Sequence, residues 1–154
     1  MITWIINFKK LNYISSKSSS DENSTKSSQD RILIVDDDAD IALTFKNGLE
    51  SIGFQVEAFV SAQELLSYFK PDYYSLLLID IRMEEMSGFE LYKRIREKDN
   101  KPRVCFITSF PNYYESLIEN YPEFELTCLI AKPITIENLI ARIKAELGTN
   151  SDNS

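Results

Sequence analysis

The chain has 154 residues, of which 44% are hydrophobic and 27% charged, and this composition predicts one folded globular domain. It contains no histidine, which excludes Ser-His-Asp and Cys-His hydrolases and any phosphotransfer step in which this chain itself carries phosphohistidine. The net charge of −7 divides into +2 over residues 1–29 and −9 over the rest. Because so acidic a domain repels phosphate backbones, we expect no direct binding to nucleic acid.

Residues 1–29 differ in composition from the rest of the chain. Between residues 15 and 28, eight of fourteen residues are serine and none is apolar, so this stretch is predicted to be a disordered linker that buries too little surface to fold. Residues 1–14 are more apolar and could form a docking helix, a surface anchor or an extension without a role. We therefore expect a Ser-rich extension over residues 1–29, one folded domain over residues 30–148 and a polar tail over residues 149–154.

Two features predict a cytoplasmic protein. The apolar stretch from Met1 to Phe8 covers about eight residues, whereas a membrane-spanning helix needs roughly 20, so no membrane span is expected. The two cysteines, Cys105 and Cys128, lie inside apolar runs without CxxC spacing, and we expect both to be reduced thiols in the core.

Hydrophobic periodicity predicts strands that alternate with helices. Short runs rich in branched apolar residues and bounded by breakers predict five strands: Arg31–Val35, Phe54–Phe59, Ser75–Ile79, Arg103–Ile107 and Thr127–Ile130. Helical spacing predicts helices within residues 41–52, 62–69, 89–95 and 136–147, and more weakly around residues 112–120. Ser61 and Ser87 begin capping boxes, and Gly148 is placed to end the last helix. This order predicts an α/β fold, a flavodoxin-like, doubly wound (βα)5 parallel sheet with strand order 2-1-3-4-5.

Polar residues follow four of the five predicted strands. Listed by strand, they are Asp36, Asp37 and Asp38 after the first, Asp80 after the third, Thr108 with Ser109 after the fourth, and Lys132 with Pro133 after the fifth. Because the carboxyl ends of parallel strands meet at one edge of the sheet, we expect these residues to converge. Converging carboxylates repel one another unless a hard cation binds between them, and Mg²⁺ is the natural candidate. A carboxylate, Mg²⁺, a hydroxyl and an ammonium together would form a site for an aspartyl phosphate.

Four motifs at these strand ends make residues 30–148 similar to the response-regulator receiver domains of two-component signalling: ILIVDDD (32–38), LLLIDIRMEEMSG (76–88), FITS (106–109) and IAKP (130–133). The resemblance implies that Asp80 is the phosphoacceptor and takes a phosphoryl group from a histidine kinase or a histidine phosphotransfer protein. Thr108 would hydrogen-bond a phosphoryl oxygen, and Lys132, followed by a cis Lys132–Pro133 bond, would pair with the phosphate. The implied Mg²⁺ ligands are Asp36 through water, Asp37, Asp80 and the backbone carbonyl of Arg82.

The resemblance also implies how the signal leaves the domain. A conformational change would be read by a separate partner protein on the face formed by the fourth helix, fifth strand and fifth helix, with the receiver acting as a monomer or a phosphorylation-dependent dimer. Because only 22 residues follow Lys132, we expect a stand-alone receiver, and not an enzyme that turns over an external substrate. Two positions depart from the family pattern: Glu84 replaces a usual proline, and Leu129 replaces a usual aromatic residue of the switch. Arg82, two residues beyond Asp80, is expected to alter the lifetime of the aspartyl phosphate.

Two alternative functions remain open from the sequence. The pattern Asp36-x-Asp38 also resembles the haloacid-dehalogenase-like Mg²⁺-dependent phosphatases, with Asp36 as nucleophile, although no further acidic pair or cap is evident and Asp80 would have no role. The other alternative is a phosphorylation-independent, receiver-like interaction scaffold. Taken singly, Asp38 is expected to cap the first helix, and Asp80 or Lys132 could be an ordinary loop residue.

Overall fold

The computed structural model describes residues 29–113, 118–122 and 128–148. The predicted N-terminal extension, except Gln29, and the predicted polar tail lie outside the described residues. The weak helix expected around residues 112–120 lies partly outside them, and the part that is described begins with a short 3-10 helix, η2 (Pro111–Tyr113). Within the described segments, no helix is long and apolar enough to cross a membrane.

Five parallel strands form one sheet in the order β2-β1-β3-β4-β5, which confirms the predicted topology. The strands are β1 (Arg31–Val35), β2 (Gln55–Phe59), β3 (Leu76–Asp80), β4 (Arg103–Thr108) and β5 (Leu129–Ala131). All five residues of β3 are buried, because this strand lies between β1 and β4 and is covered on both faces. The run of apolar residues that predicted a doubly covered strand therefore occupies the centre of the sheet.

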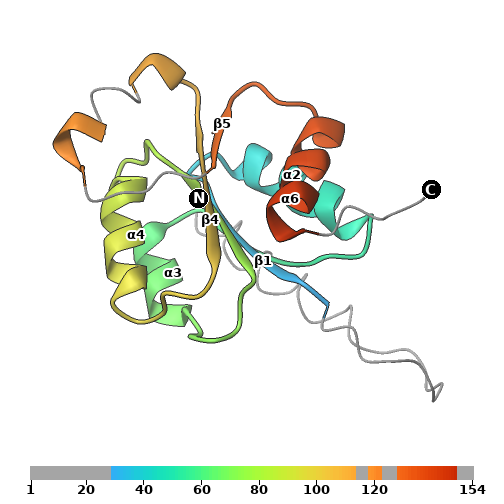
Figure 1. Cartoon of the computed structure of the whole chain (residues 1–154), viewed down its shortest axis with the longest axis horizontal. Helices are drawn as coiled ribbons and strands as arrows, with labels where there is room; N and C mark the ends of the chain where they lie inside the picture. Colours follow the sequence, from blue (N-terminus) through green and yellow to red (C-terminus); the bar gives the residue numbers. More distant parts are fainter. Residues whose placement is uncertain (1–28, 114–117, 123–127, 149–154) are drawn as a thin grey trace.

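The helices cover the two faces of the sheet as two separate layers (Figure 1). Their bounds are α2 (Ala39–Glu50), α3 (Ala62–Tyr68), α4 (Gly88–Arg96) and α6 (Ile136–Leu147). Helices α2 and α6 pack on one face, around Leu49 and Leu139, while α3 and α4 pack on the other, around Leu65 and Phe89. Burial of these two apolar layers is what holds the strand ends in fixed positions.

The predicted starts of α3 and α4 and the predicted end of α6 agree with the caps in the structure, whereas α2 begins and ends two residues before the range predicted for it. The side chains of Ser61 and Ser87 accept hydrogen bonds from the backbone N–H groups of Glu64 and Glu90, at the starts of α3 and α4. Gly148 ends α6 with a φ of 69°, a left-handed conformation that glycine adopts without steric cost. The Lys132–Pro133 peptide bond is cis, as the resemblance implied.

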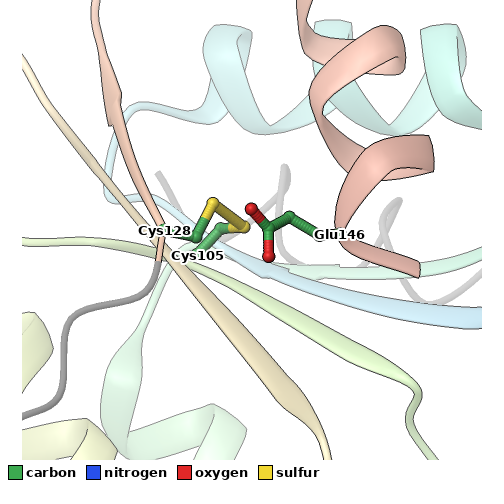
Figure 2. Close-up of side chains that lie close together, drawn as sticks. All are labelled: Cys105, Cys128 and Glu146. Carbon is green, nitrogen blue, oxygen red and sulfur yellow. A yellow bond between two sulfur atoms is a disulfide. The ribbon is translucent and has the colours of Figure 1, made fainter. Parts of the chain in front are cut away.

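The expectation of two reduced thiols is wrong in this structure. Cys105 of β4 and Cys128, the residue before β5, form a disulfide with a Cα–Cα distance of 4.6 Å (Figure 2). The two cysteines meet because β4 and β5 pair in a register that aligns Phe106 with Leu129, so the residues before these two also lie opposite each other. That register depends on the tertiary fold, and the spacing of the cysteines along the sequence contains no sign of it.

Candidate functional site

The sheet brings the predicted site residues to one edge. Strands β1 and β3 end at the same level, so Asp36, which follows β1, lies next to Asp80, the last residue of β3. Thr108 ends the adjacent strand β4, and Lys132 follows β5. The convergence expected from the strand order is therefore present, with all four residues contributed by different strands.

Three carboxylates form a compact cluster at this edge. Asp36, Asp37 and Asp80 each offer an oxygen atom, and these oxygens lie within 4.8 Å of one another. Asp36 is 1% exposed and Asp80 is 5% exposed, whereas Asp37 lies at the surface. The donor set fits Mg²⁺, which prefers hard oxygen ligands and keeps several water molecules, because it combines two shielded carboxylates with one that faces solvent.

Lys132 supplies the positive charge of the cluster. Its Nζ lies 2.6 Å from Oδ2 of Asp36 and 3.7 Å from Oδ1 of Asp80, and its side chain is 10% exposed. One ammonium cannot neutralise three carboxylates, so the site keeps an excess of negative charge. A divalent cation would remove that excess.

The carboxyl of Asp80 holds its proton to a higher pH than an ordinary aspartate. Burial and the neighbouring carboxylates of Asp36 and Asp37 together raise the pKa of this carboxyl to about 6, although Lys132 and the backbone N–H of Arg82 act in the opposite direction. A bound cation would favour the ionised form, which is the form that can act as a nucleophile. The chemistry of the cluster therefore fits a metal-assisted carboxylate.

Thr108 accepts hydrogen bonds from the loop that follows β4 and from Lys132, the residue after β5. Its side chain is 3% exposed, and its hydroxyl oxygen accepts a hydrogen bond of 3.0 Å from the backbone N–H of Phe110. Its carbonyl oxygen accepts a hydrogen bond of 2.7 Å from the backbone N–H of Lys132. These contacts fix the position of the hydroxyl, whose own proton can be donated to an oxygen bound near Asp80.

Asp38 has a different task from the other acids. Its Oδ1 accepts hydrogen bonds from the backbone N–H groups of Asp40 and Ile41, which makes it the N-cap of α2, as the sequence predicted. Its own backbone N–H donates a hydrogen bond of 2.9 Å to Oδ1 of Asp36. Asp38 thus begins the helix and at the same time orients the buried carboxylate.

Gly88 is a site residue to which the sequence analysis assigned no role. A Cβ atom at this position would lie 2.2 Å from the backbone oxygen of Asp80, so only glycine allows α4 to begin this close to the end of β3. Its backbone N–H also donates a hydrogen bond of 2.9 Å to the oxygen of Ile81. The only sequence signal was its position as the last residue of the motif at 76–88.

A second unassigned contact lies beside the acidic cluster. The guanidinium carbon of Arg82 lies 4.8 Å from the ring centroid of Phe110, and the two residues line a depression of about 390 Å³ together with Ser109, Pro111 and Asn112. Phe110 is 54% exposed, so the pair forms part of the surface above the site. Sequence periodicity holds no signal for this contact, because it joins two loops 28 residues apart.

Comparison with known proteins identifies the family. The profile of the response regulator receiver domain matches residues 32–144, which is most of the chain. The chain belongs to the response regulator receiver domain family. It is similar to the uncharacterized transcriptional regulatory protein YkoG of Bacillus subtilis, with 33% identity over 122 residues, covering 77% of this chain and 51% of that protein. It is also similar to the transcriptional regulatory protein DltR of Streptococcus agalactiae, with 29% identity over 114 residues, covering 74% of this chain and 50% of that protein.

Solved structures of receiver domains have the same fold. A CheY-like receiver domain protein from Methanospirillum hungatei JF-1 matches with a TM-score of 0.69 and 30% identity, covering 79% of this chain and 96% of that one. The non-phosphorylated HemR receiver domain from Leptospira biflexa matches with a TM-score of 0.69 and 25% identity, covering 82% of this chain and 100% of that one. The chain spans about half the length of the curated relatives it matches. It is a response regulator receiver domain of two-component signalling.

Proposed function

We propose that this receiver domain accepts a phosphoryl group on Asp80 from the phosphohistidine of a histidine kinase or a histidine phosphotransfer protein, and that the reaction uses Mg²⁺. The observation that carries this proposal is the position of the Asp80 carboxylate, which ends the central strand within 4.8 Å of two further carboxylates and 3.7 Å from the ammonium of Lys132. The absence of histidine in the chain agrees with a partner that supplies the phosphohistidine.

The metal would be held by Asp36 through water, by Asp37, by Asp80 and by the backbone carbonyl of Arg82. When bound, Mg²⁺ supplies charge neutralisation between the carboxylates and the incoming phosphoryl group. The shielded position of Asp36 and the solvent-facing position of Asp37 support this division between a water-mediated and a direct ligand.

The transfer step follows from the contacts of the protein's own residues. A carboxylate oxygen of Asp80 attacks the phosphorus atom, the P–N bond to the donor imidazole breaks, and the imidazole leaves with the electron pair of that bond. Lys132 pairs with one phosphoryl oxygen, and the hydroxyl of Thr108 donates a hydrogen bond to another. Lys132 also lines an open groove of about 550 Å³ together with residues of α2, including Ile41 and Thr44.

The signal would then pass to a separate downstream protein. Phosphorylation would shift an equilibrium between two surface states, read on the helix expected around residues 112–120, on β5 and on α6, with the receiver as a monomer or a phosphorylation-dependent dimer. Leu129 in place of the usual aromatic residue makes the readout through β5 the least typical part of this scheme. The receiver would act in the cytoplasm, where histidine kinases present their phosphohistidine. The acidic charge of the chain supports a direct partner that is a protein and not nucleic acid; the relatives named as transcriptional regulators are about twice as long as their matched part.

The contacts of Asp36 argue against the phosphatase alternative. Its Oδ1 accepts the backbone N–H of Asp38, and its Oδ2 pairs with Lys132 at 2.6 Å, so both oxygens are occupied. A nucleophile needs an oxygen directed at the incoming phosphorus atom. Burying the carboxyl groups of Asp36 and Asp80 side by side costs free energy, and an interaction scaffold that is never phosphorylated has no use for this arrangement.

The test is labelling of the full chain with acetyl phosphate in the presence of Mg²⁺. The wild-type protein and the control Glu84→Gln, which changes an exposed acid in the loop after β3, are expected to incorporate one phosphoryl group. Asp80→Asn is expected to lose labelling, and addition of EDTA is expected to abolish it in the wild type. Equal labelling of wild type and Asp80→Asn, with both proteins folded by circular dichroism, would contradict the proposal.

A further inference from the structure

The Cys105–Cys128 disulfide lies at the start of β5, whereas Lys132 of the phosphoacceptor site follows the end of this strand. Both side chains are completely buried, in the core between the sheet and α6. Figure 2 shows that Glu146, from the last turn of α6, directs its carboxylate at the two sulfur atoms. One carboxylate oxygen and the two sulfur atoms all lie within 4.8 Å of one another. A thiol that is to react requires a proton acceptor, and the carboxylate of Glu146 is within reach of both sulfur atoms.

The disulfide links β5, the shortest strand of the sheet, covalently to β4. Strand β5 has three residues and pairs with β4 at three positions, the last of which aligns Thr108 with Ala131. Cys128 directly precedes the first of these pairs, so the disulfide extends the attachment of β5 by one covalent link. Lys132 follows the other end of β5 and donates its backbone N–H to Thr108 at 2.7 Å. A shift of β5 relative to β4 would therefore move Lys132 and Thr108 relative to each other.

We propose that Cys105 and Cys128 form a reversible redox site in which hydrogen peroxide makes the disulfide, a dithiol breaks it, and the state of the pair sets the rate at which Asp80 is phosphorylated. The consequence for Asp80 rests on the function proposed above. In the disulfide state β5 is held against β4, and Lys132 and Thr108 are kept in position for the phosphoryl group. In the dithiol state β5 lacks this covalent link to β4, and the same residues are less well positioned.

The oxidation balances without a further reactant. One thiol gives its proton to Glu146, its sulfur attacks a peroxide oxygen, the O–O bond breaks, and the departing hydroxide takes up that proton as water, which leaves a sulfenic acid. The second sulfur then attacks the sulfenic sulfur, the S–O bond breaks, and its hydroxyl leaves with the second thiol proton as another water. Two thiols are oxidised by two electrons, and one peroxide is reduced to two water molecules. In the return step, one dithiol is oxidised to its own disulfide and gives two protons to the cysteines.

Access to the buried sulfur atoms requires local opening. Glu146 is in the final turn of α6, next to the end of that helix at Gly148. Helix ends open at a far lower free-energy cost than the strands of a core, so a small oxidant can reach the pair without global unfolding. Glu146 also lies 3.3 Å from Nε of Arg142, one turn earlier on α6, and this contact keeps its carboxylate near the pair.

The experiment uses the full chain reduced with dithiothreitol, desalted and then treated with hydrogen peroxide. Disulfide formation is followed by maleimide labelling of denatured samples, and each state is then labelled with acetyl phosphate and Mg²⁺. We expect peroxide to form the intramolecular disulfide and dithiothreitol to reverse it. The reduced form should label at least about fivefold more slowly than the oxidised form, the lower end of the range for coupled sites. Glu146→Gln should slow disulfide formation by at least about tenfold, as expected for loss of a proton acceptor.

The matched control is the double variant Cys105→Ala/Cys128→Ala. It retains Met83 and Met86, which peroxide can also oxidise, so any effect of methionine oxidation on labelling would appear in this variant as well. Its labelling rate should not change with peroxide or dithiothreitol. The comparison of oxidised and reduced wild type stays decisive even if this variant fails to fold. Failure of the disulfide to form, or a reduced form that labels as fast as the oxidised form, overturns the inference. Loss of labelling in both states, with reversible disulfide formation intact, instead overturns the proposed phosphoacceptor role and with it the coupling to Asp80.

Discussion

The ionisation of Asp80 gives a prediction that needs neither a metal ion nor a phosphoryl donor. In the metal-free protein the folded-state pKa of this carboxyl is about 6, against an ordinary value of 3.8, because the group is buried and lies beside Asp36 and Asp37. A raised folded-state pKa contributes stability that is fully present below pH 3.8 and is lost as the pH rises through about 6. A difference of about two pKa units corresponds to about 3 kcal/mol at 1.36 kcal/mol per unit.

The perturbation is Asp80→Asn, which keeps the shape of the side chain and removes the charge. In metal-free solution at pH 7.5, the variant is expected to exceed the wild type in free energy of unfolding by about 3 kcal/mol. Near pH 4 the wild-type carboxyl is mostly protonated, so the two proteins should differ little. Excess Mg²⁺ should remove most of this difference in free energy of unfolding at pH 7.5. A Mg²⁺ concentration of about 100 times the dissociation constant stabilises the folded wild type by about 2.7 kcal/mol.

The assay is urea unfolding in EDTA, followed by circular dichroism, at several pH values between 4 and 8. The difference between wild type and variant isolates Asp80 from the many other acids that titrate over the same range. Glu84→Gln, an exposed acid in the loop after β3, serves as the control and should show no such pH-dependent difference. A difference between wild type and Asp80→Asn that does not change with pH, or a wild type that is more stable than the variant at pH 7.5 without metal, would refute the electrostatic argument.

Two further predictions concern the loops around the site. Gly88→Ala should destabilise the fold by about 3 kcal/mol and weaken Mg²⁺ binding, because the added Cβ would lie 2.2 Å from the backbone oxygen of Asp80; unchanged urea unfolding and Mg²⁺ titration would contradict this. Arg82→Ala should speed hydrolysis of the aspartyl phosphate about threefold, because the variant loses the cation–π contact with Phe110 that covers the site. This factor corresponds to the free energy of one exposed cation–π contact. Phe110→Leu removes the same contact and should act in the same direction. Equal rates of phosphate release from the wild type and Arg82→Ala would exclude this role.

The positions of the strands and of the site residues were predictable because their signals are local. A buried parallel strand such as β3 appears in the sequence as a continuous apolar run, and the residue at its carboxyl end is then known to within one position. Asp80 was expected directly after the strand and is its last residue, since the pairing with β4 continues to Asp80 and Ile107. Thr108 is likewise the last residue of β4, because it pairs with Ala131.

The contacts that the sequence did not reveal depend on register or on close packing. The Cys105–Cys128 disulfide requires that two strands whose cysteines are 23 positions apart in the sequence pair at one particular register, which no periodicity along the chain encodes. The need for glycine at position 88 arises from the approach of α4 to the end of β3, and this approach exists only in the folded protein. Propensity and periodicity describe single elements, so they cannot predict contacts between elements.

The central claim is that Asp80 carries the phosphoryl group, and mapping the modified residue tests it most directly. The full chain is phosphorylated with acetyl phosphate and Mg²⁺, the acyl phosphate is trapped by reduction with borohydride, and the labelled peptide is sequenced by mass spectrometry. The account predicts that the modification lies at Asp80 alone. Modification at Asp36, which would indicate the phosphatase-like alternative, or at a serine or threonine, would contradict it.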